Sequence, residues 1–214
     1  MRIDLLCTNP EHPVVPALRH WIANRAGEHD VRLIQDRSEL ADGDILFLVS
    51  CTQLIGRDDR AGYAYVLVLH ASDLPEGRGW SPHVWDILDG KEDLTLSLLT
   101  AEEGVDTGAI WAKRCFRVPK HFLYDEINDL LFQSELNLIE RGIEMVAAGE
   151  APVPQSAEGG SYYPRRTPED SCLDPSRALA DLFDQIRVAD PDRFPAYFEM
   201  HGHIYNITLK KRET

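Results

Sequence analysis

Short, continuous apolar runs alternate with segments of helical periodicity through the first half of the chain. Residues 14–24 place Val15, Leu18 and Trp21 on one stripe of a helix. Continuous apolar runs separated by helical spacers are typical of parallel strands that are buried on both faces of a sheet. The pattern therefore predicts an α/β fold with a mostly parallel sheet flanked by helices. The expected strands are residues 3–7, 31–35, 44–50, 63–69, 94–100 and 109–118.

Two further helices are expected after the first four strands. Residues 81–90 indicate a short helix with Ser81 as its N-cap and Gly90 at its end. Residues 122–149 have the apolar stripe of a long amphipathic helix.

The remaining residues form a smaller extension. Residues 150–174 are rich in Pro, Gly and Ser, and an aperiodic loop of this length is usually functional or disordered. A short helix over 175–186 and a β-hairpin with Gly202 in its turn follow. We therefore expect a core over residues 1–149 and an extension over residues 150–214 that packs on it.

The chain is strongly acidic. It has 214 residues, with 22 Lys and Arg against 36 Asp and Glu, and a formal net charge of −14. Proteins that grip a nucleic-acid backbone concentrate basic residues on one face, so we expect no nucleic-acid partner. The longest apolar runs are too short for a membrane span, and the first residues lack the apolar core of a signal peptide. We therefore expect a cytoplasmic protein without a membrane partner.

The cysteines are widely separated and form no CxxC pair, so neither a metal site nor a disulfide framework is indicated. We expect small core or near-site residues at Cys7, Cys51, Cys115 and Cys172.

The junction between the first strand and the first helix reads CTNPEHP and contains no glycine. The dinucleotide-binding fingerprint is therefore missing, and the P-loop signature is missing from the chain as well. The sheet is not expected to hold a dinucleotide or a nucleoside triphosphate in either familiar way.

Two chemically active side chains each follow a predicted strand. His70 comes directly after residues 63–69, and Asp106 lies in the turn-rich segment after residues 94–100. In an open parallel sheet, ligands bind beyond the carboxyl ends of the strands, so these side chains are placed to meet. A carboxylate beside an imidazole orients the ring, and such a pair assists the attack of an amine on a carbonyl. A histidine before a turn is more often structural, so spacing alone leaves both interpretations open.

A longer and more specific pattern covers residues 70–111, HASDLPEGRGWSPHVWDILDGKEDLTLSLLTAEEGVDTGAIW. It combines a His, a Ser two positions later, Leu-Pro, Arg-Gly, a Trp-containing helix, a strand and Val-Asp-Thr-Gly. This stretch resembles the formyltransferase family that uses 10-formyltetrahydrofolate. Weaker likeness extends from the first strand to SYYPRRTPED and the FPAYF hairpin. The resemblance implies a Rossmann-like formyltransferase fold with 10-formyltetrahydrofolate as the co-substrate.

The resemblance also implies roles for particular residues. His70 and Asp106 match the family's catalytic pair: His70 stabilises a tetrahedral intermediate and relays protons, and Asp106 orients His70. The pterin is implied to lie against two loop segments, with contacts from Gln53, Leu54, Ile55, Thr100, Glu103, Gly104 and Val105. The expected substrate-binding residues are Ser72, Arg78, Gly79, Trp80, Tyr163 and Arg165, with Tyr162 and Arg166 beside them. The alternatives are an Arg78 bound to a loop carbonyl, a Trp80 in the core, and a solvated pair at Arg165 and Arg166.

One position departs from the family pattern. The family usually has Asn two residues before the His, whereas this chain has Val68. Valine donates no hydrogen bond to a formyl oxygen, and the loss of such a donor raises a barrier by about 3 kcal/mol. Asn9 and Gln53 are the candidate replacements.

Among the branches of this family, GRGWSP and SYYPRRTPED look most like the sugar N-formyltransferases, which act on nucleotide-linked amino sugars for cell-surface polysaccharides. We expect that substrate class, with a 4-amino-4,6-dideoxy sugar of the pseudaminic-acid or O-antigen type as the leading candidate. The methionyl-tRNA enzymes of the family are longer and append a tRNA-binding barrel, so this shorter and acidic chain is not expected to belong to that branch. A glycinamide ribonucleotide-type formyltransferase and a catalytically impaired binding protein are the alternatives. Family members often pair, so a homodimer through the C-terminal hairpin is also open.

Overall fold

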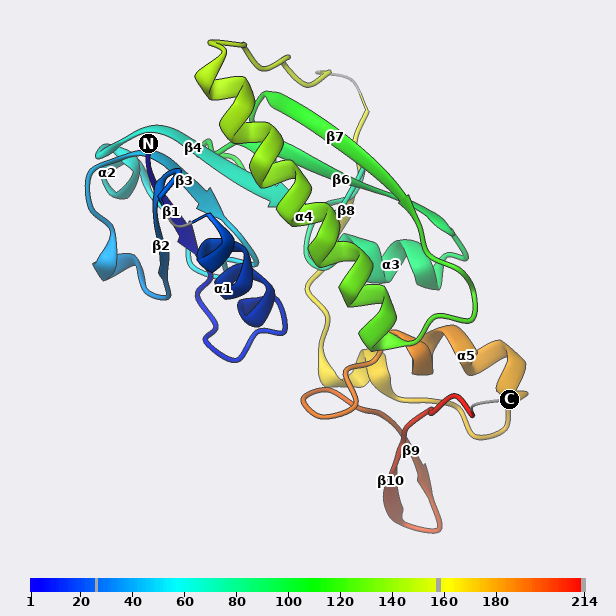
Figure 1. Ribbon diagram of the computed structural model, residues 1–214. Helices are drawn as coiled ribbons and strands as arrows, with labels where there is room; N and C mark the ends of the chain where they lie inside the picture. Colours follow the sequence, from blue (N-terminus) through cyan, green and yellow to red (C-terminus); the bar gives the residue numbers. More distant parts are fainter. Residues whose placement is uncertain (26, 157–158, 213–214) are drawn as a thin grey trace.

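The computed structural model describes residues 1–25, 27–156 and 159–212, and these form an α/β fold around a six-stranded sheet (Figure 1). The strand order is β2-β1-β3-β4-β6-β7. The strands are β1 (Arg2–Leu6), β2 (Asp30–Ile34), β3 (Gly43–Leu48), β4 (Tyr63–His70), β6 (Asp93–Thr100) and β7 (Ile110–Arg117). The mostly parallel sheet that the sequence predicts is confirmed.

One strand of the sheet, β6, runs against the others. Strands β1 to β4 pair in parallel, whereas β6 pairs antiparallel with β4, and β7 pairs antiparallel with β6. The register places Thr100 opposite Leu67 and Ser97 opposite His70. The segment after β6 therefore leaves the sheet alongside the middle of β4 and not at its carboxyl end.

Two helices cover one face of the sheet. Helix α1 (Val15–Asn24) and the long helix α4 (Tyr124–Ala147) bury Leu18, Leu138 and Ile139 in the largest core cluster, together with strand residues such as Phe47. Figure 1 shows α4 running across this face. At Gly142 the helix lies close to the sheet, because a Cβ there would meet Leu98 Cδ2 at 2.8 Å.

The opposite face carries a smaller apolar cluster. Its strand members include Leu46, Leu48 and Val66, and Val68 packs against it. Connecting segments with short elements contribute the rest, since Ile55 is buried in the same cluster. These elements are the 3₁₀ helix η1 (Arg37–Glu39) and helix α2 (Arg57–Arg60).

The short helix after β4 begins where the sequence predicts, but its N-cap side chain is not used. Helix α3 spans Pro82–Leu88, and Ser81 precedes it, but its hydroxyl makes no capping hydrogen bond. Ser81 therefore holds the expected N-cap position without capping the helix through its side chain, because its backbone is left-handed, with a φ of 47°, whereas a capping residue has an extended one. Gly90, with a φ of 83°, follows the end of the helix as expected.

Residues 150–174 are more ordered than the composition indicates. Val153 bridges to Ile110, strand β8 (Tyr162–Tyr163) pairs in parallel with β5 (Arg78–Gly79), and the 3₁₀ helix η2 spans Pro168–Ser171. Residues 157–158 of this predicted loop lie outside the described residues.

The C-terminal elements match the prediction with one shift. Helix α5 spans Leu179–Arg187, so the expected start at residue 175 is wrong. Strands β9 (Ala196–Met200) and β10 (His203–Ile207) form the expected hairpin, which projects from the body of the molecule (Figure 1). His201 and Gly202 make its turn, both with positive φ.

The cysteine prediction is right for two of the four residues. Cys7 is buried and Cys51 is half-buried, whereas Cys115 and Cys172 are exposed, so their expected core or near-site position is not found. All four are free thiols. Within the described part of the chain, no cluster of His, Cys, Asp and Glu is suited to a metal ion, and no helix has the length and hydropathy for a membrane crossing.

Candidate active site

His70 ends strand β4 and is 7% exposed. Its Nε2 atom lies 2.8 Å from the backbone oxygen of Gly77. Because a carbonyl oxygen only accepts hydrogen bonds, Nε2 carries the proton and donates it. The other ring nitrogen, Nδ1, faces Asp106 Oδ1 at 3.5 Å. Nδ1 is therefore the atom that can take up a proton beside a carboxylate, and the expected pairing of His70 with Asp106 is confirmed.

The route that brings Asp106 to His70 differs from the one expected. Since β6 is antiparallel to β4, the two residues do not follow neighbouring parallel strands, and the segment 101–109 turns back toward the end of β4 to reach His70. Asp106 has a φ of 54°, and its Oδ2 atom accepts a hydrogen bond from the backbone N–H of Gly79 at 2.9 Å. Only part of the carboxylate thus faces the imidazole.

The loop after His70 is held by the later segment around β8. The N–H of Gly77 donates to Ser161 Oγ at 2.8 Å, and the N–H of Trp80 donates to the backbone oxygen of Tyr163 at 3.1 Å. Gly79 has a φ of 99°, and a Cβ there would lie 2.4 Å from the oxygen of Tyr163. Glycine is required at this position by both its conformation and its close contact.

The expected substrate-binding residues lie in different environments. Arg78 donates to Gln155 Oε1 at 3.0 Å, and the Arg165 guanidinium stacks 4.9 Å above the ring of Trp80. Gly79 and Trp80 are half-buried, whereas Arg165 is exposed. Ser72 is only 1% exposed, beneath Gly77, where a Cβ would lie 2.9 Å from Ser72 Cβ.

The Tyr163 hydroxyl is hydrogen-bonded within the protein. It donates to Asp86 Oδ1 at 2.7 Å, and the Tyr163 ring stacks on Trp85 with centroids 6.1 Å apart. Burial, and then the bond to Asp86, raise the pKa of Tyr163 above its ordinary value. The neighbouring Tyr162 is 58% exposed.

Two of the expected folate residues line a hollow of about 580 Å³ between α2 and the segment 101–109. Glu103 and Gly104 line it together with Arg57 and Arg60. Leu54 and Val105 expose apolar side chains, at 78% and 55%.

The other expected folate residues are already engaged by the protein. The Gln53 amide donates to Asp36 and accepts from the N–H of Arg37, and Thr100 Oγ1 accepts from Trp111 Nε1 at 2.9 Å. Ile55 is buried in the smaller apolar cluster.

Val68 shares a face of β4 with His70, because side chains alternate along a strand. It packs against the smaller apolar cluster, so no donor comes from this position. Of the two candidate replacements, Gln53 already donates to Asp36, whereas the bond of Asn9 to the N–H of Glu11 uses only its side-chain oxygen and not its amide donors.

Sequence reasoning missed several residues that build this site. Gln155 and Ser161 lie in an aperiodic segment, where no spacing marks a contact with residues 77–79 or 106. His83 was also missed; burial lowers its pKa to about 4, so it is neutral near pH 7.

Comparison with known proteins gives consistent results. A family model described as formyl transferase matches residues 5–141. A methionyl-tRNA formyltransferase from Symbiobacterium thermophilum is 32% identical over 124 residues, which are 58% of this chain and 38% of that protein. The chain therefore spans about two fifths of the length of this curated relative.

Two solved structures share the fold at low identity. HypX from Aquifex aeolicus, in complex with tetrahydrofolic acid, has a TM-score of 0.82 at 20% identity, covering 98% of this chain and 37% of that one. A sugar N-formyltransferase from Shewanella sp. FDAARGOS_354 has a TM-score of 0.74 at 18% identity, covering 100% and 99%.

Proposed function

The chain belongs to the formyl transferase family, and we propose that it moves a formyl group from 10-formyltetrahydrofolate to the amine of a nucleotide-linked amino sugar. The observation that carries formyl transfer is the buried His70, whose Nδ1 atom faces Asp106 at the end of β4. Both residues lie within the matched range.

The chemistry follows from the two ring nitrogens. 10-Formyltetrahydrofolate supplies an electrophilic formyl carbon, and the substrate amine forms the new C–N bond as the bond to the folate nitrogen breaks. His70 Nδ1 accepts the proton that the amine loses, and it returns a proton to the departing folate nitrogen. Asp106 stabilises the imidazolium between these steps, and Gly77 keeps the ring oriented through Nε2.

The residues near Asp106 suit a folate. Glu103 and Gly104 line the hollow beside α2, and Leu54 and Val105 offer exposed apolar contact to a ring system. The fold shared with HypX, which was solved with tetrahydrofolic acid, supports the same co-substrate.

The nucleotide-sugar acceptor is supported by the surface near the loop after His70. Trp80 carries a stacked Arg165, and Tyr162 is largely exposed, which together offer aromatic and cationic contacts to a sugar nucleotide. The sugar N-formyltransferase from Shewanella matches over nearly all of both chains.

The sequence relative acts on methionyl-tRNA, so that acceptor is the competing proposal. The net charge of −14 opposes binding of a polyanion as large as tRNA.

One assay separates the acceptors. Purified protein is incubated with 10-formyltetrahydrofolate and, separately, a panel of nucleotide-linked amino sugars, glycinamide ribonucleotide or methionyl-tRNA, and tetrahydrofolate release is followed. We expect turnover with an amino sugar. Turnover only with glycinamide ribonucleotide or methionyl-tRNA would overturn the acceptor, and no turnover with any of them would support a binding protein without catalysis.

Val68 makes the proposed transfer slower than it would be with the family's usual residue. Val68→Asn places a donor on the face that His70 shares, and we expect kcat to rise by about 10-fold or more. Asn9→Ala and Gln53→Ala serve as controls for the two candidate replacements, and at saturating co-substrate we expect both to keep the wild-type kcat; Gln53 already donates to Asp36, whereas Asn9 uses only its side-chain oxygen. A fall in kcat for either control would identify it as the replacement donor.

We propose the expected division of the chain, with a catalytic core over residues 1–149 and an extension over residues 150–214. The pairing of β5 with β8 supports packing of the extension on the core. A homodimer through the hairpin of β9 and β10 is supported by its exposed apolar side chains, which are Met200, Ile204 and Tyr205.

A further inference from the structure

One amide side chain connects the two loops that form the candidate active site. Gln155 Nε2 donates to the backbone oxygens of Asp106 and Gly108, each at 2.8 Å. Its Oε1 atom accepts from the Arg78 guanidinium at 3.0 Å. A single side chain thus joins the segment 101–109 to the loop after β4.

These bonds act on the backbone that carries the catalytic carboxylate. Asp106 has a left-handed backbone, which is uncommon for a non-glycine residue. Gln155 holds the carbonyl of Asp106, and the N–H of Gly79 holds its carboxylate. The Gln155 amide also holds Arg78, which precedes Gly79 in the chain. It therefore constrains the backbone next to the Gly79 N–H that binds the Asp106 carboxylate.

We propose that Gln155 is a positioning residue that sets the separation of Asp106 from His70 and the orientation of Arg78. This inference rests on the proposed formyl transfer, in which Asp106 must stand beside Nδ1 of His70. Gln155 bonds neither to the His70 imidazole nor to the Asp106 carboxylate. It acts only through Arg78 and the backbone of residues 106 and 108.

The amide is suited to this role because it offers donors on one end and an acceptor on the other. Glutamate would retain a partner for Arg78, but it would place an acceptor against two carbonyl oxygens. Alanine would remove both interactions. The pair Gln155→Ala and Gln155→Glu therefore separates the hold on Asp106 from the hold on Arg78.

The first measurement does not depend on activity. Hydrogen–deuterium exchange is followed in the full chain for the backbone amides of residues 77–80 and 102–109. We expect both variants to speed exchange in residues 102–109, and Gln155→Ala to speed exchange in residues 77–80 more than Gln155→Glu does. The matched control is Gln133→Ala, because Gln133 is exposed on α4.

The second measurement separates positioning from general structure. With the acceptor that turns over, we expect both variants to lower kcat by about 10- to 100-fold, because a displaced catalytic group loses its alignment. KM for the co-substrate and the acceptor should change by less than about threefold for Gln155→Glu, while Gln133→Ala matches the wild-type protein.

The outcomes separate this inference from the proposed function. Unchanged exchange and an unchanged kcat in Gln155→Glu would overturn the role of Gln155, whatever Gln155→Ala does to folding. If the wild-type protein transfers formyl to no acceptor, the proposed function fails, and faster exchange in residues 102–109 would still support the positioning of Asp106 by Gln155.

Discussion

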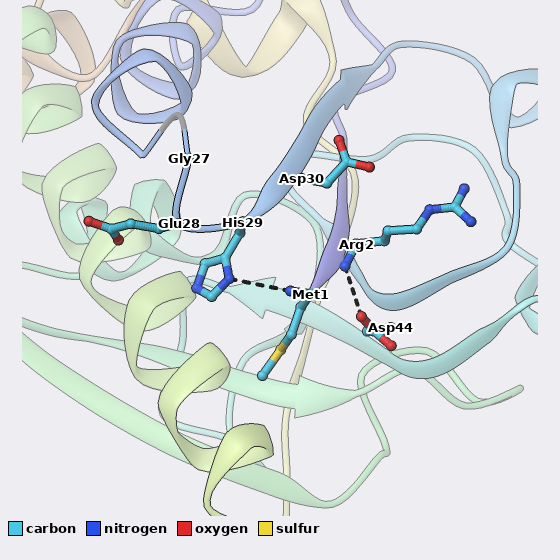
Figure 2. A pocket seen from close by; sticks show the side chains of 7 residues that line it. All are labelled: Met1, Arg2, Gly27, Glu28, His29, Asp30 and Asp44. Carbon is cyan, nitrogen blue, oxygen red and sulfur yellow. Dashed lines mark hydrogen bonds between the residues drawn. The ribbon is translucent and has the colours of Figure 1, made fainter.

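The two ends of the parallel strands carry similar side chains in different surroundings. At the amino ends of β1, β2 and β3, a hollow of about 680 Å³ is lined by charged residues that include His29, Asp30 and Asp44 (Figure 2). Asp44 binds the N–H of Arg2, and His29 lies 3.5 Å from the terminal amine. At the carboxyl end of β4, His70 and Asp106 face each other, and there two loops and a later segment enclose them.

The comparison shows that residue type alone does not make a site. His29 is half-buried beside the chain terminus, whereas His70 is 7% exposed and held through Nε2 by Gly77. The enclosing contacts exclude water from His70 and fix the nitrogen that faces Asp106. Among the contacts described for the residues at the amino ends of the strands, no loop or later segment encloses His29 in this way.

The largest expected effect compares the two histidines. His70→Asn should lower kcat by about 10²- to 10⁴-fold, because the proton acceptor is lost. His29→Asn should leave kcat unchanged, since His29 lies at the opposite end of the strands. The measurement is tetrahydrofolate release under saturating substrates. A wild-type rate for His70→Asn would show that the enclosed His70 is no more important for catalysis than His29.

A smaller effect compares two glycines with nearly the same φ. Gly79 and Gly27 have φ values of 99° and 100°, but a Cβ at Gly79 would lie 2.4 Å from the Tyr163 oxygen, whereas a Cβ at Gly27 would meet nothing within 4 Å. Both Ala variants carry the strain of positive φ, so their difference isolates packing. We expect Gly79→Ala to unfold at lower urea, with an additional loss of about 1–3 kcal/mol.

Equal free energies of unfolding for Gly79→Ala and Gly27→Ala would show that the loop after β4 adjusts without cost. In that case the close packing of β5 against β8 would not explain why residue 79 is a glycine.

The third effect appears only with a change of pH. Glu135 on α4 is buried, and burial raises its pKa to about 8 from an ordinary value of 4.5. Its contribution to stability is therefore fully present below about pH 4.5 and is lost as the pH rises through 8. Burial raises the pKa of Cys7, which follows β1, and the nearby Glu135 adds to that rise, so Glu135 lies on the carboxyl side of the sheet.

Glu135→Gln removes the ionisable group. Relative to the wild-type protein, its free energy of unfolding should rise by about 1.4 kcal/mol for each pH unit between these two values. Urea unfolding at pH 5 and pH 8 measures the difference. If the free energies of unfolding of Glu135→Gln and the wild-type protein differ by the same amount at pH 5 and pH 8, Glu135 is not buried in its uncharged form.

The sequence was sufficient for most of the fold because buried strands leave continuous apolar runs. It could not show the direction of β6, since residues 94–100 have the same apolar pattern in a parallel or an antiparallel strand. It also could not show the backbone of Ser81, which depends on the loop before it. Periodicity reports which side chains are buried, and strand direction depends on contacts between distant segments.

For the site, the pattern of residues 70–111 was sufficient to pair His70 with Asp106. The geometric reason was wrong, because Asp106 reaches His70 through a returning segment and not through a parallel strand. The roles of Gln155 and Ser161 could not be predicted from the sequence, for the same reason as the direction of β6. Their contacts span segments with no local periodicity, and only the folded chain brings them to Gly77 and Asp106.

The pairing of β5 with β8 also has a consequence for the order in which the chain folds. Gly77 and Ser161 are separated by 84 positions, so their contact closes a long loop that includes β6, β7 and α4. Contacts this distant in sequence form late, because the entropy of loop closure must be overcome first. During synthesis from the N-terminus, the sheet can assemble while the loop after His70 is still unsupported. The enclosure around His70 therefore follows the emergence of residues 155–163 from the ribosome.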